Sequence, residues 1–148
     1  MKKKTLLFLG AVLLSSFAVN AQEVEIVKDK ILLDGKQFLK YEKINISNHS
    51  FFNMNDEEIL NYRSFDNETP KYVDDDYYAL NFINEKTKVE STDFSRIMAF
   101  MNSRKSCEKL IKWMLKDKVL NTDGTINPEK LEVFVQKYDE KVTERTMR

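Results

Sequence analysis

The chain has 148 residues, and its 24 Lys and Arg residues equal its 24 Asp and Glu residues, so the formal net charge is zero. This length predicts a single domain with a sizeable core. The balance of charges argues against a nucleic-acid-binding protein, which needs a basic face, and against tight binding to anionic lipid.

Residues 1–21 have the pattern of an export signal. Lys2, Lys3 and Lys4 precede an apolar run over residues 6–14, and the segment ends with the small residue Ala21. The apolar run is shorter than the roughly 20 residues of a membrane-spanning helix. We therefore expect a signal peptide over residues 1–21, and a periplasmic or secreted protein that keeps no transmembrane anchor after cleavage. Removing three lysines leaves 21 basic and 24 acidic residues, a net charge of −3.

Residues 23–90 predict an antiparallel sheet of about five or six short strands. Asp34-Gly35 lies between two apolar runs, which is a hairpin signal because the turn needs positive φ. Shifts in the alternation near residues 28–30 and 42–43 indicate bulges or an extra tight turn. Residues 59–65 are compatible with a strand or a short helix, and their aromatic and branched side chains favour the strand.

One further strand and one loop complete this half of the chain. Residues 77–83 predict a strand in which Tyr78, Leu80 and Phe82 share one face. Residues 66–76 are polar and predict a loop. It contains or adjoins our candidate binding residues, which are Tyr72, Asp74, Asp75, Asp76 and Tyr77. A run of adjacent aspartates is otherwise typical of a solvated loop.

From residue 93 onward the apolar spacing changes to that of helices. Asp93 is a candidate cap for a first helix, and Ser106 for a second one. Two apolar sets of different phase indicate two helices or one broken helix: Phe94, Ile97, Met98 and Met101, then Cys107, Leu110, Ile111 and Met114. Trp113 lies off the second stripe, which suggests contacts on more than one side.

The last helix has the clearest start signal. Asn127 is an N-cap residue type, Pro128 suits the first helical position, and Glu129 suits the positive helix end. An apolar stripe follows, made of Leu131, Phe134, Val135 and Tyr138. Residues 139–148 are polar, and we expect them to fray.

Strands first and helices last predict an α+β fold, in which an N-terminal antiparallel sheet is covered by two or three C-terminal helices. We expect one domain over residues 22–148. Its sheet part spans 23–90, its helical part 93–138 and its frayed tail 139–148.

The sequence offers little metal chemistry, and we expect no cofactor. His49 and Cys107 are each the only residue of their type, whereas zinc needs several converging ligands. Residues 121–126 resemble the middle of a calcium-binding EF-hand loop. However, Val119 and Lys130 then fall at the first and twelfth positions, where carboxylates are required. We interpret the segment as an ordinary turn.

No catalytic motif stands out, and we assign no catalytic residue. His49 lies in a polar stretch that predicts a surface loop. We interpret Cys107 as a buried residue on a helix face rather than a reactive thiol. A nucleophilic site needs a base, a nucleophile and an orienting group. A pair of carboxylates, as in glycosidases, stays open because acids are plentiful.

Two segments resemble exported proteins of Bacteroidota. The lysine-rich leader ends Asn20-Ala21-Gln22, and the C-terminal pattern runs from Lys109-Leu110 through Asp123-Gly124-Thr125-Ile126-Asn127 to Phe134 and Tyr138. This pattern is similar to the ends of small uncharacterised exported proteins of that group. The resemblance implies export and carries no activity.

We therefore favour a non-enzymatic binding module of the cell envelope. Its expected partner is another envelope or secreted protein, bound through the sheet face or through loop 66–76. The alternative is a small exported hydrolase that uses carboxylates or His49.

Overall fold

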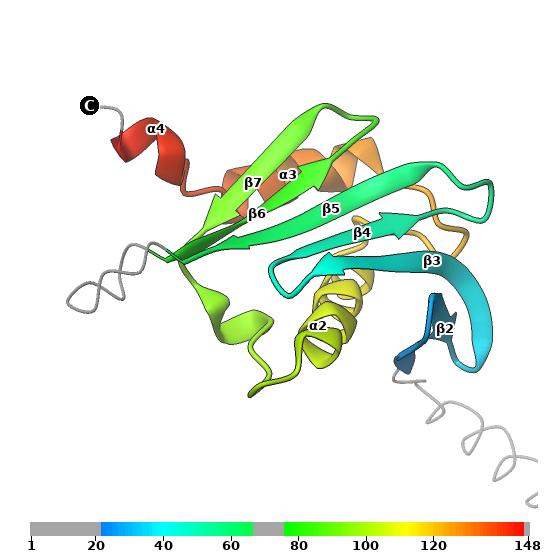
Figure 1. Ribbon diagram of the computed structural model, residues 1–148. Coiled ribbons are helices and arrows are strands. Elements are labelled where there is room, and N and C mark those ends of the chain that lie inside the picture. Colours follow the sequence, from blue (N-terminus) through cyan, green and yellow to red (C-terminus); the bar gives the residue numbers. More distant parts are fainter. Residues whose placement is uncertain (1–21, 67–75, 147–148) are drawn as a thin grey trace, which may run out of the picture.

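The computed structural model describes residues 22–66 and 76–146. The expected signal peptide, residues 67–75 and the last two residues lie outside the described part. In chain order the elements are β1 (Val24–Val27), β2 (Lys30–Leu33), β3 (Lys36–Asn45), β4 (Asn48–Phe52), β5 (Glu58–Phe65), β6 (Tyr77–Phe82), β7 (Thr87–Ser91), the 3-10 turn η3 (Phe94–Arg96), α2 (Ser103–Lys116), α3 (Pro128–Tyr138) and α4 (Val142–Thr146) (Figure 1).

The strands form one antiparallel meander in which spatial order equals chain order. The predicted α+β class is confirmed, and the described strands number seven rather than five or six. The hairpin at Asp34-Gly35 is present, with φ values of 51° and 83°. The extra tight turn occurs after β1, where Lys28 has a φ of 55°. A register shift between Lys43 and Asn45 supplies the predicted bulge.

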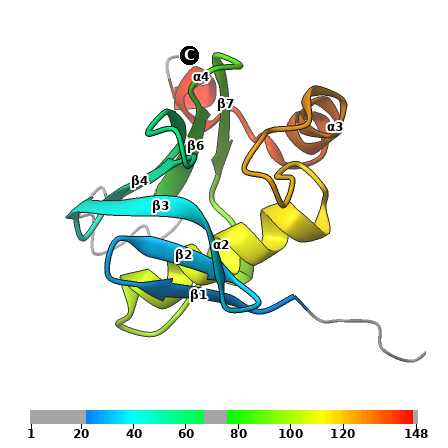
Figure 2. The same cartoon turned by 90° about the vertical axis from the view of Figure 1, so that its right-hand side faces the viewer.

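One face of the sheet forms the core with the helices. Tyr78, Leu80 and Phe82 lie on it, as predicted, and all three are buried. Figure 2 shows that the sheet curls, so that β1 and β2 lie beside α2 while α3 lies near β7. The helices thus remove from water the apolar face that an isolated sheet would expose.

The prediction of a helix that begins after Asp93 is wrong. Only Phe94–Arg96 form a 3-10 turn, and α2 begins at Ser103, so Ser106 is not its cap. Asn102 is the cap instead, because its side chain accepts a hydrogen bond from the backbone N–H of Lys105 (3.0 Å). Met101 just before it has a φ of 50°, which is incompatible with a continuous helix. The last helix is confirmed, with Asn127 as its cap.

The first residues of the segment that we expected to fray are instead held against β7, whereas residues 147–148 lie outside the described part. The Asp139 carboxylate accepts a hydrogen bond from the Glu90 N–H (3.0 Å), and the Glu140 N–H donates to the Glu90 carbonyl (2.8 Å). The Glu140 carboxylate also accepts the Thr92 N–H (2.7 Å). A polar segment is ordered here because it pairs with the free edge of a sheet.

The opposite edge of the sheet is closed by a helix side chain. Glu108 of α2 is buried, and its carboxylate accepts the Ile26 N–H of β1 (2.9 Å). Lys105 lies 3.0 Å from the other carboxylate oxygen. Both edge strands therefore have backbone groups satisfied by carboxylates, which blocks pairing with further strands there. No helix in the described part is both long enough and apolar enough to cross a membrane.

Candidate functional site: a cationic pocket with aromatic walls

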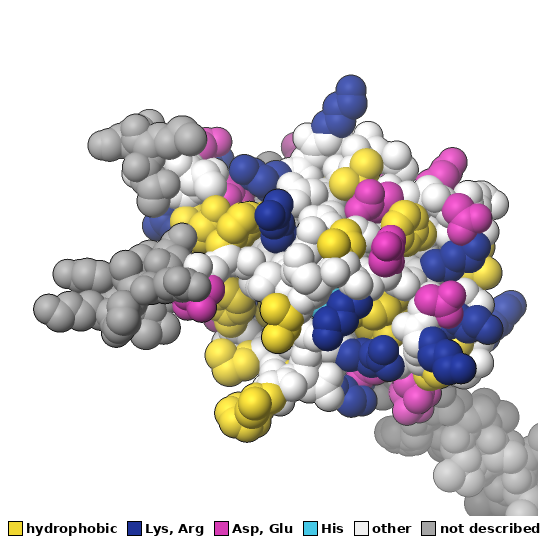
Figure 3. Space-filling model, in the orientation of Figure 1, with side chains coloured by type: hydrophobic (Ala, Val, Ile, Leu, Met, Phe, Trp, Pro, Cys, Tyr) yellow, Lys and Arg dark blue, Asp and Glu magenta, His cyan; other side chains and the backbone are white. Residues whose placement is uncertain are grey.

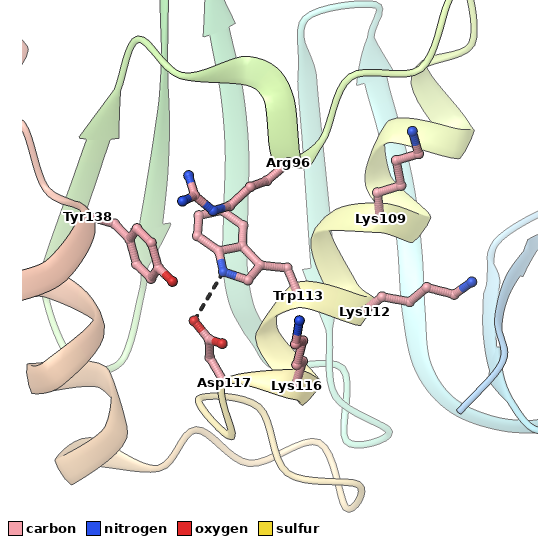
Figure 4. Close-up of a pocket in the computed structure, with 7 residues that line it drawn as sticks. All are labelled: Arg96, Lys109, Lys112, Trp113, Lys116, Asp117 and Tyr138. Atoms are coloured by element: carbon pink, nitrogen blue, oxygen red, sulfur yellow. Dashed lines mark hydrogen bonds between the residues drawn. The ribbon is translucent and has the colours of Figure 1, made fainter. Parts of the chain in front are cut away.

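A pocket of about 440 Å³ opens where η3, α2 and α3 meet, on the side of α2 away from the sheet (Figure 4). Its volume falls within the range of small-molecule sites. The lining side chains are Arg96, Lys109, Lys112, Trp113, Lys116, Asp117 and Tyr138. Three segments far apart in sequence thus contribute to one concave surface.

Two aromatic rings form the wall of the pocket. The rings of Trp113 and Tyr138 meet edge to face, with centroids 4.9 Å apart. The Arg96 guanidinium carbon lies 4.8 Å from the Tyr138 centroid and 5.5 Å from that of Trp113. Because ring faces attract cations, both rings hold this guanidinium at the pocket. Phe134 contacts Trp113 from α3 and so supports the wall from the core side.

Positive charge dominates the pocket. Among the residues that the structure describes, Asp117 is the one lining carboxylate, against four lining cations. It accepts a hydrogen bond from the Trp113 indole N–H (3.1 Å). Arg96 forms an ion pair with Asp93 (2.9 Å), and Lys109 donates to the Met98 carbonyl (2.6 Å). Lys112 and Lys116 are exposed and form no ion pair with any residue that the structure describes. An anion on an apolar body would find both cations and ring surface here.

The predicted binding residues are not gathered at this pocket. Tyr72, Asp74 and Asp75 lie outside the described residues. Tyr77 is half-buried and stacks on Phe65 with a centroid distance of 4.6 Å. Asp76 lines a different, open pocket, close to η3. Binding by loop 66–76 therefore stays a prediction.

The placement of His49 corrects the surface-loop interpretation. His49 lies in β4 and has no exposed surface. Its ring is stacked between Tyr41 and Tyr62, at centroid distances of 5.8 Å on each side. Nδ1 lies 2.8 Å from the Tyr41 hydroxyl and Nε2 lies 3.1 Å from the Ile46 carbonyl. Since a carbonyl only accepts, Nε2 carries the proton, and Nδ1 accepts from Tyr41.

Cys107 is a buried free thiol, as predicted. Burial raises its pKa to about 12, and this effect outweighs the nearby Tyr41 hydroxyl and the charge of Lys43, which lower it. The thiol therefore stays protonated near neutral pH, which removes the thiolate that nucleophilic chemistry needs. Cys107, Tyr41 and His49 form a polar cluster inside the core, without access to a substrate.

His49 should make folding pH-dependent. Burial lowers its pKa, Lys43 lowers it further, and the Ile46 hydrogen bond only partly opposes both effects. The unfolded chain takes up a proton near pH 6.5 while the folded chain does not. The free energy of unfolding should therefore fall as the pH drops below about 6.5, by up to about 1.4 kcal/mol per pH unit, until the folded-state pKa is passed. Urea denaturation between about pH 5 and 7 measures this slope.

His49→Phe is the matched variant, because it keeps a ring between the two tyrosines and removes the titration. His49 is the sole histidine, so the variant should lose most of the slope between about pH 5 and 7, whatever its absolute stability. The carboxyl groups of Asp93, Asp123 and Glu140 also have lowered pKa values, but they affect stability at lower pH than the histidine does. If the free energy of unfolding of His49→Phe depends on pH as it does in the parent chain, His49 is not the group responsible for this dependence.

The EF-hand-like segment is used as a turn. The Asp123 carboxylate accepts hydrogen bonds from the Thr125 N–H (3.0 Å) and hydroxyl (2.6 Å). Gly124 has a φ of 86°, and a Cβ there would lie 3.2 Å from a methyl group of Leu39. Among the described residues, no three or more His, Cys, Asp or Glu side chains are grouped so that they could hold a metal ion.

Sequence reasoning missed this pocket, although one signal was available. Lys105, Lys109, Lys112 and Lys116 recur at i, i+4, i+7 and i+11, which places them on one helix face. The expectation that Trp113 contacts more than one side is confirmed by its contacts with Phe134, Tyr138 and Arg96. No sequence signal linked Arg96 and Tyr138 to α2.

Comparisons with known proteins identified no relative of this chain. A scan against protein-family models, a search of curated proteins and a search of solved structures each returned no match. The function must therefore be argued from the geometry of the pocket.

Proposed function

We propose that this protein is an exported, non-enzymatic binding module of the cell envelope that takes an anionic group into the pocket between η3, α2 and α3. Export rests on the leader pattern of residues 1–21. Binding rests on the arrangement of Arg96, Trp113 and Tyr138 beside the lysines of α2. The ligand class is a phosphate or carboxylate carried on an apolar or aromatic body.

The observation that carries the proposal is the combination of ring surface with cations in one cavity. Arg96 lies against both rings, while the exposed Lys112 and Lys116 of α2 line the same pocket. A ligand ring can contact Trp113 and Tyr138, while its anionic group accepts hydrogen bonds from the lysines. The carboxylate of Asp117 accepts a hydrogen bond from the indole N–H, and its negative charge is outweighed by the four cations among the described lining residues.

The hydrolase alternative draws no support from His49. Both ring nitrogens are hydrogen-bonded inside the core, and the side chain has no exposed surface. A general base must reach the proton that it removes. The two acidic residues that are buried in the described part also have partners. Glu108 accepts the Ile26 N–H of β1, and Glu90 accepts the Thr143 hydroxyl near the C-terminus.

Trp113, the sole tryptophan, serves as an intrinsic reporter of the pocket. Titration with phenyl phosphate should change its fluorescence with saturation, at a Kd at least about tenfold lower than for inorganic phosphate or phenol, because only phenyl phosphate uses both the rings and the cations. Lys112→Gln with Lys116→Gln should weaken phenyl phosphate binding by about tenfold.

Lys36→Gln with Lys86→Gln is the matched control, since both lysines are exposed and lie in strand or turn positions away from α2. This control should bind phenyl phosphate like the parent chain. If fluorescence and calorimetry show no saturable binding of phenyl phosphate, or if both lysine pairs have equal effects, the pocket is not an anion site.

A further inference from the structure

The segment between η3 and α2 exposes three large apolar side chains to water. Met98, Phe100 and Met101 are 63%, 90% and 91% exposed, and the last two exceed every other large apolar side chain in the described part of the chain. Figure 3 shows an apolar group projecting from the lower left of the molecule, where Figure 1 draws this segment. We call Met98, Phe100 and Met101 the apolar tip. Clustered exposed apolar groups of this kind mark interaction sites.

The apolar tip adjoins a row of lysines. Lys105, Lys109, Lys112 and Lys116 are all exposed and share the face of α2 opposite Cys107, Leu110 and Met114, which are buried. The row extends over roughly 16 Å of helix. Lys109 donates to the Met98 carbonyl (2.6 Å), so the row and the tip form one continuous surface.

Among the described residues, nearby acids offset only part of this charge. Glu108, the sole acid within α2, is buried against β1 and pairs with Lys105. Asp93 pairs with Arg96, and Asp117 bonds the Trp113 indole. Asp76 and Asp93 line an open pocket together with Met98 and Phe100, so acidic groups adjoin the tip on the side of η3. By contrast, charges of both signs are mixed on the sheet face that Figure 3 presents.

We propose that the apolar tip and the lysine row dock this protein on an anionic lipid surface. The tip would enter the headgroup and acyl boundary, while the lysines remain among the anionic headgroups. The overall charge, which is −3 without residues 1–21, argued against tight binding to anionic lipid. Attraction to a membrane depends instead on the charge within about a Debye length of it, and the lysine row supplies that charge locally. This docking surface is distinct from the aromatic walls of the pocket, although the two share lysines of α2.

Co-sedimentation with vesicles tests the proposal. The processed chain should bind vesicles of phosphatidylcholine with roughly 30% phosphatidylglycerol at least about tenfold more strongly than pure phosphatidylcholine, and added salt should weaken this binding. Phe100→Ser with Met101→Ser should reduce partitioning by at least about tenfold. Lys112→Gln with Lys116→Gln should reduce it by about thirty-fold. All variants begin at the same residue, so differences in partitioning arise from the substitutions alone.

Matched controls lie elsewhere on the surface. Ile46→Ser replaces an exposed apolar residue in the turn between β3 and β4, and Lys36→Gln with Lys86→Gln removes the same charge away from α2. Both should partition like the parent chain. Equal binding to the two kinds of vesicle would overturn the proposal, and so would normal partitioning of the Phe100 and Met101 variant. Tight capture of soluble polyglutamate that is unaffected by the tip variant would assign the lysine row to an acidic polypeptide instead.

The membrane test is independent of the pocket proposal. Phe100 does not line the pocket of Trp113 and Tyr138, so the tip variant should keep its response to phenyl phosphate. Arg96→Gln should weaken phenyl phosphate binding and leave the tip intact. Failure of one proposal therefore does not imply failure of the other.

Discussion

Replacing Phe134 by Ala is expected to lower the free energy of unfolding by about 3–5 kcal/mol. Phe134 is buried, and its ring contacts Phe82 of β6, Trp113 of α2 and Tyr138 of α3, at centroid distances of 6.3, 4.8 and 4.9 Å. Its removal leaves a cavity between the sheet and two helices. Urea denaturation measures the loss, and Trp113 emission in the native state should shift because its support is missing.

Two controls separate cavity formation from a general effect on α3. Phe134→Leu keeps most of the volume and should cost clearly less than Phe134→Ala. Val133→Ala changes an exposed neighbour on the same helix and should alter stability by less than about 0.5 kcal/mol. If Phe134→Ala costs no more than Val133→Ala, α3 is not packed on the sheet as described.

Glu108→Ala is expected to lower the free energy of unfolding by about 2–3 kcal/mol. The substitution removes the acceptor of the Ile26 N–H and leaves that buried donor without its partner at the edge of the sheet. Lys105 loses its ion pair as well, but that side chain is exposed and contributes little. The free energy of unfolding from urea denaturation gives the total, and hydrogen exchange at Ile26 should accelerate selectively.

Glu108→Gln keeps an oxygen acceptor at the same position and should recover a large part of the loss. Glu132→Ala, an exposed acid of α3, is the matched control for removing a helix carboxylate and should be nearly neutral. Equal costs for Glu108→Gln and Glu108→Ala would show that the carboxylate does not act as the acceptor for β1.

Both proposals depend on α2, which has three different sides. One side is buried under the sheet, a second carries the lysine row, and a third presents Trp113 to Arg96 and Tyr138. The helix can serve two surfaces because the curled sheet covers only part of it (Figure 2).

Local sequence signals were sufficient to predict several elements of the fold. Asp34-Gly35 adopts the positive φ values that its hairpin requires, and Asn127 caps α3 through hydrogen bonds to the Glu129 and Lys130 N–H groups (3.1 and 3.2 Å). These features involve residues within a few positions of one another. Their physics is therefore contained in a short stretch of sequence.

Features that depend on distant partners were missed. The helix expected from Asp93 is a separate, local error: it is a single 3-10 turn, and a second cap at Asn102 starts α2. His49 was assigned to the surface, yet Tyr41 and Tyr62 on neighbouring strands enclose it. The polar C-terminal segment was expected to fray, yet β7 supplies backbone partners for it.

The sequence by itself determined that strands precede helices, the Asp34-Gly35 hairpin, the start of α3 and the buried face of β6, because periodicity and capping act over a few residues. Tertiary structure alone decided which polar groups are hidden and which surfaces can bind. Arg96, Trp113 and Tyr138 meet only after η3, α2 and α3 have packed around Phe134. The pocket is a product of long-range packing, in which contacts between distant segments outweigh the local preferences of each one.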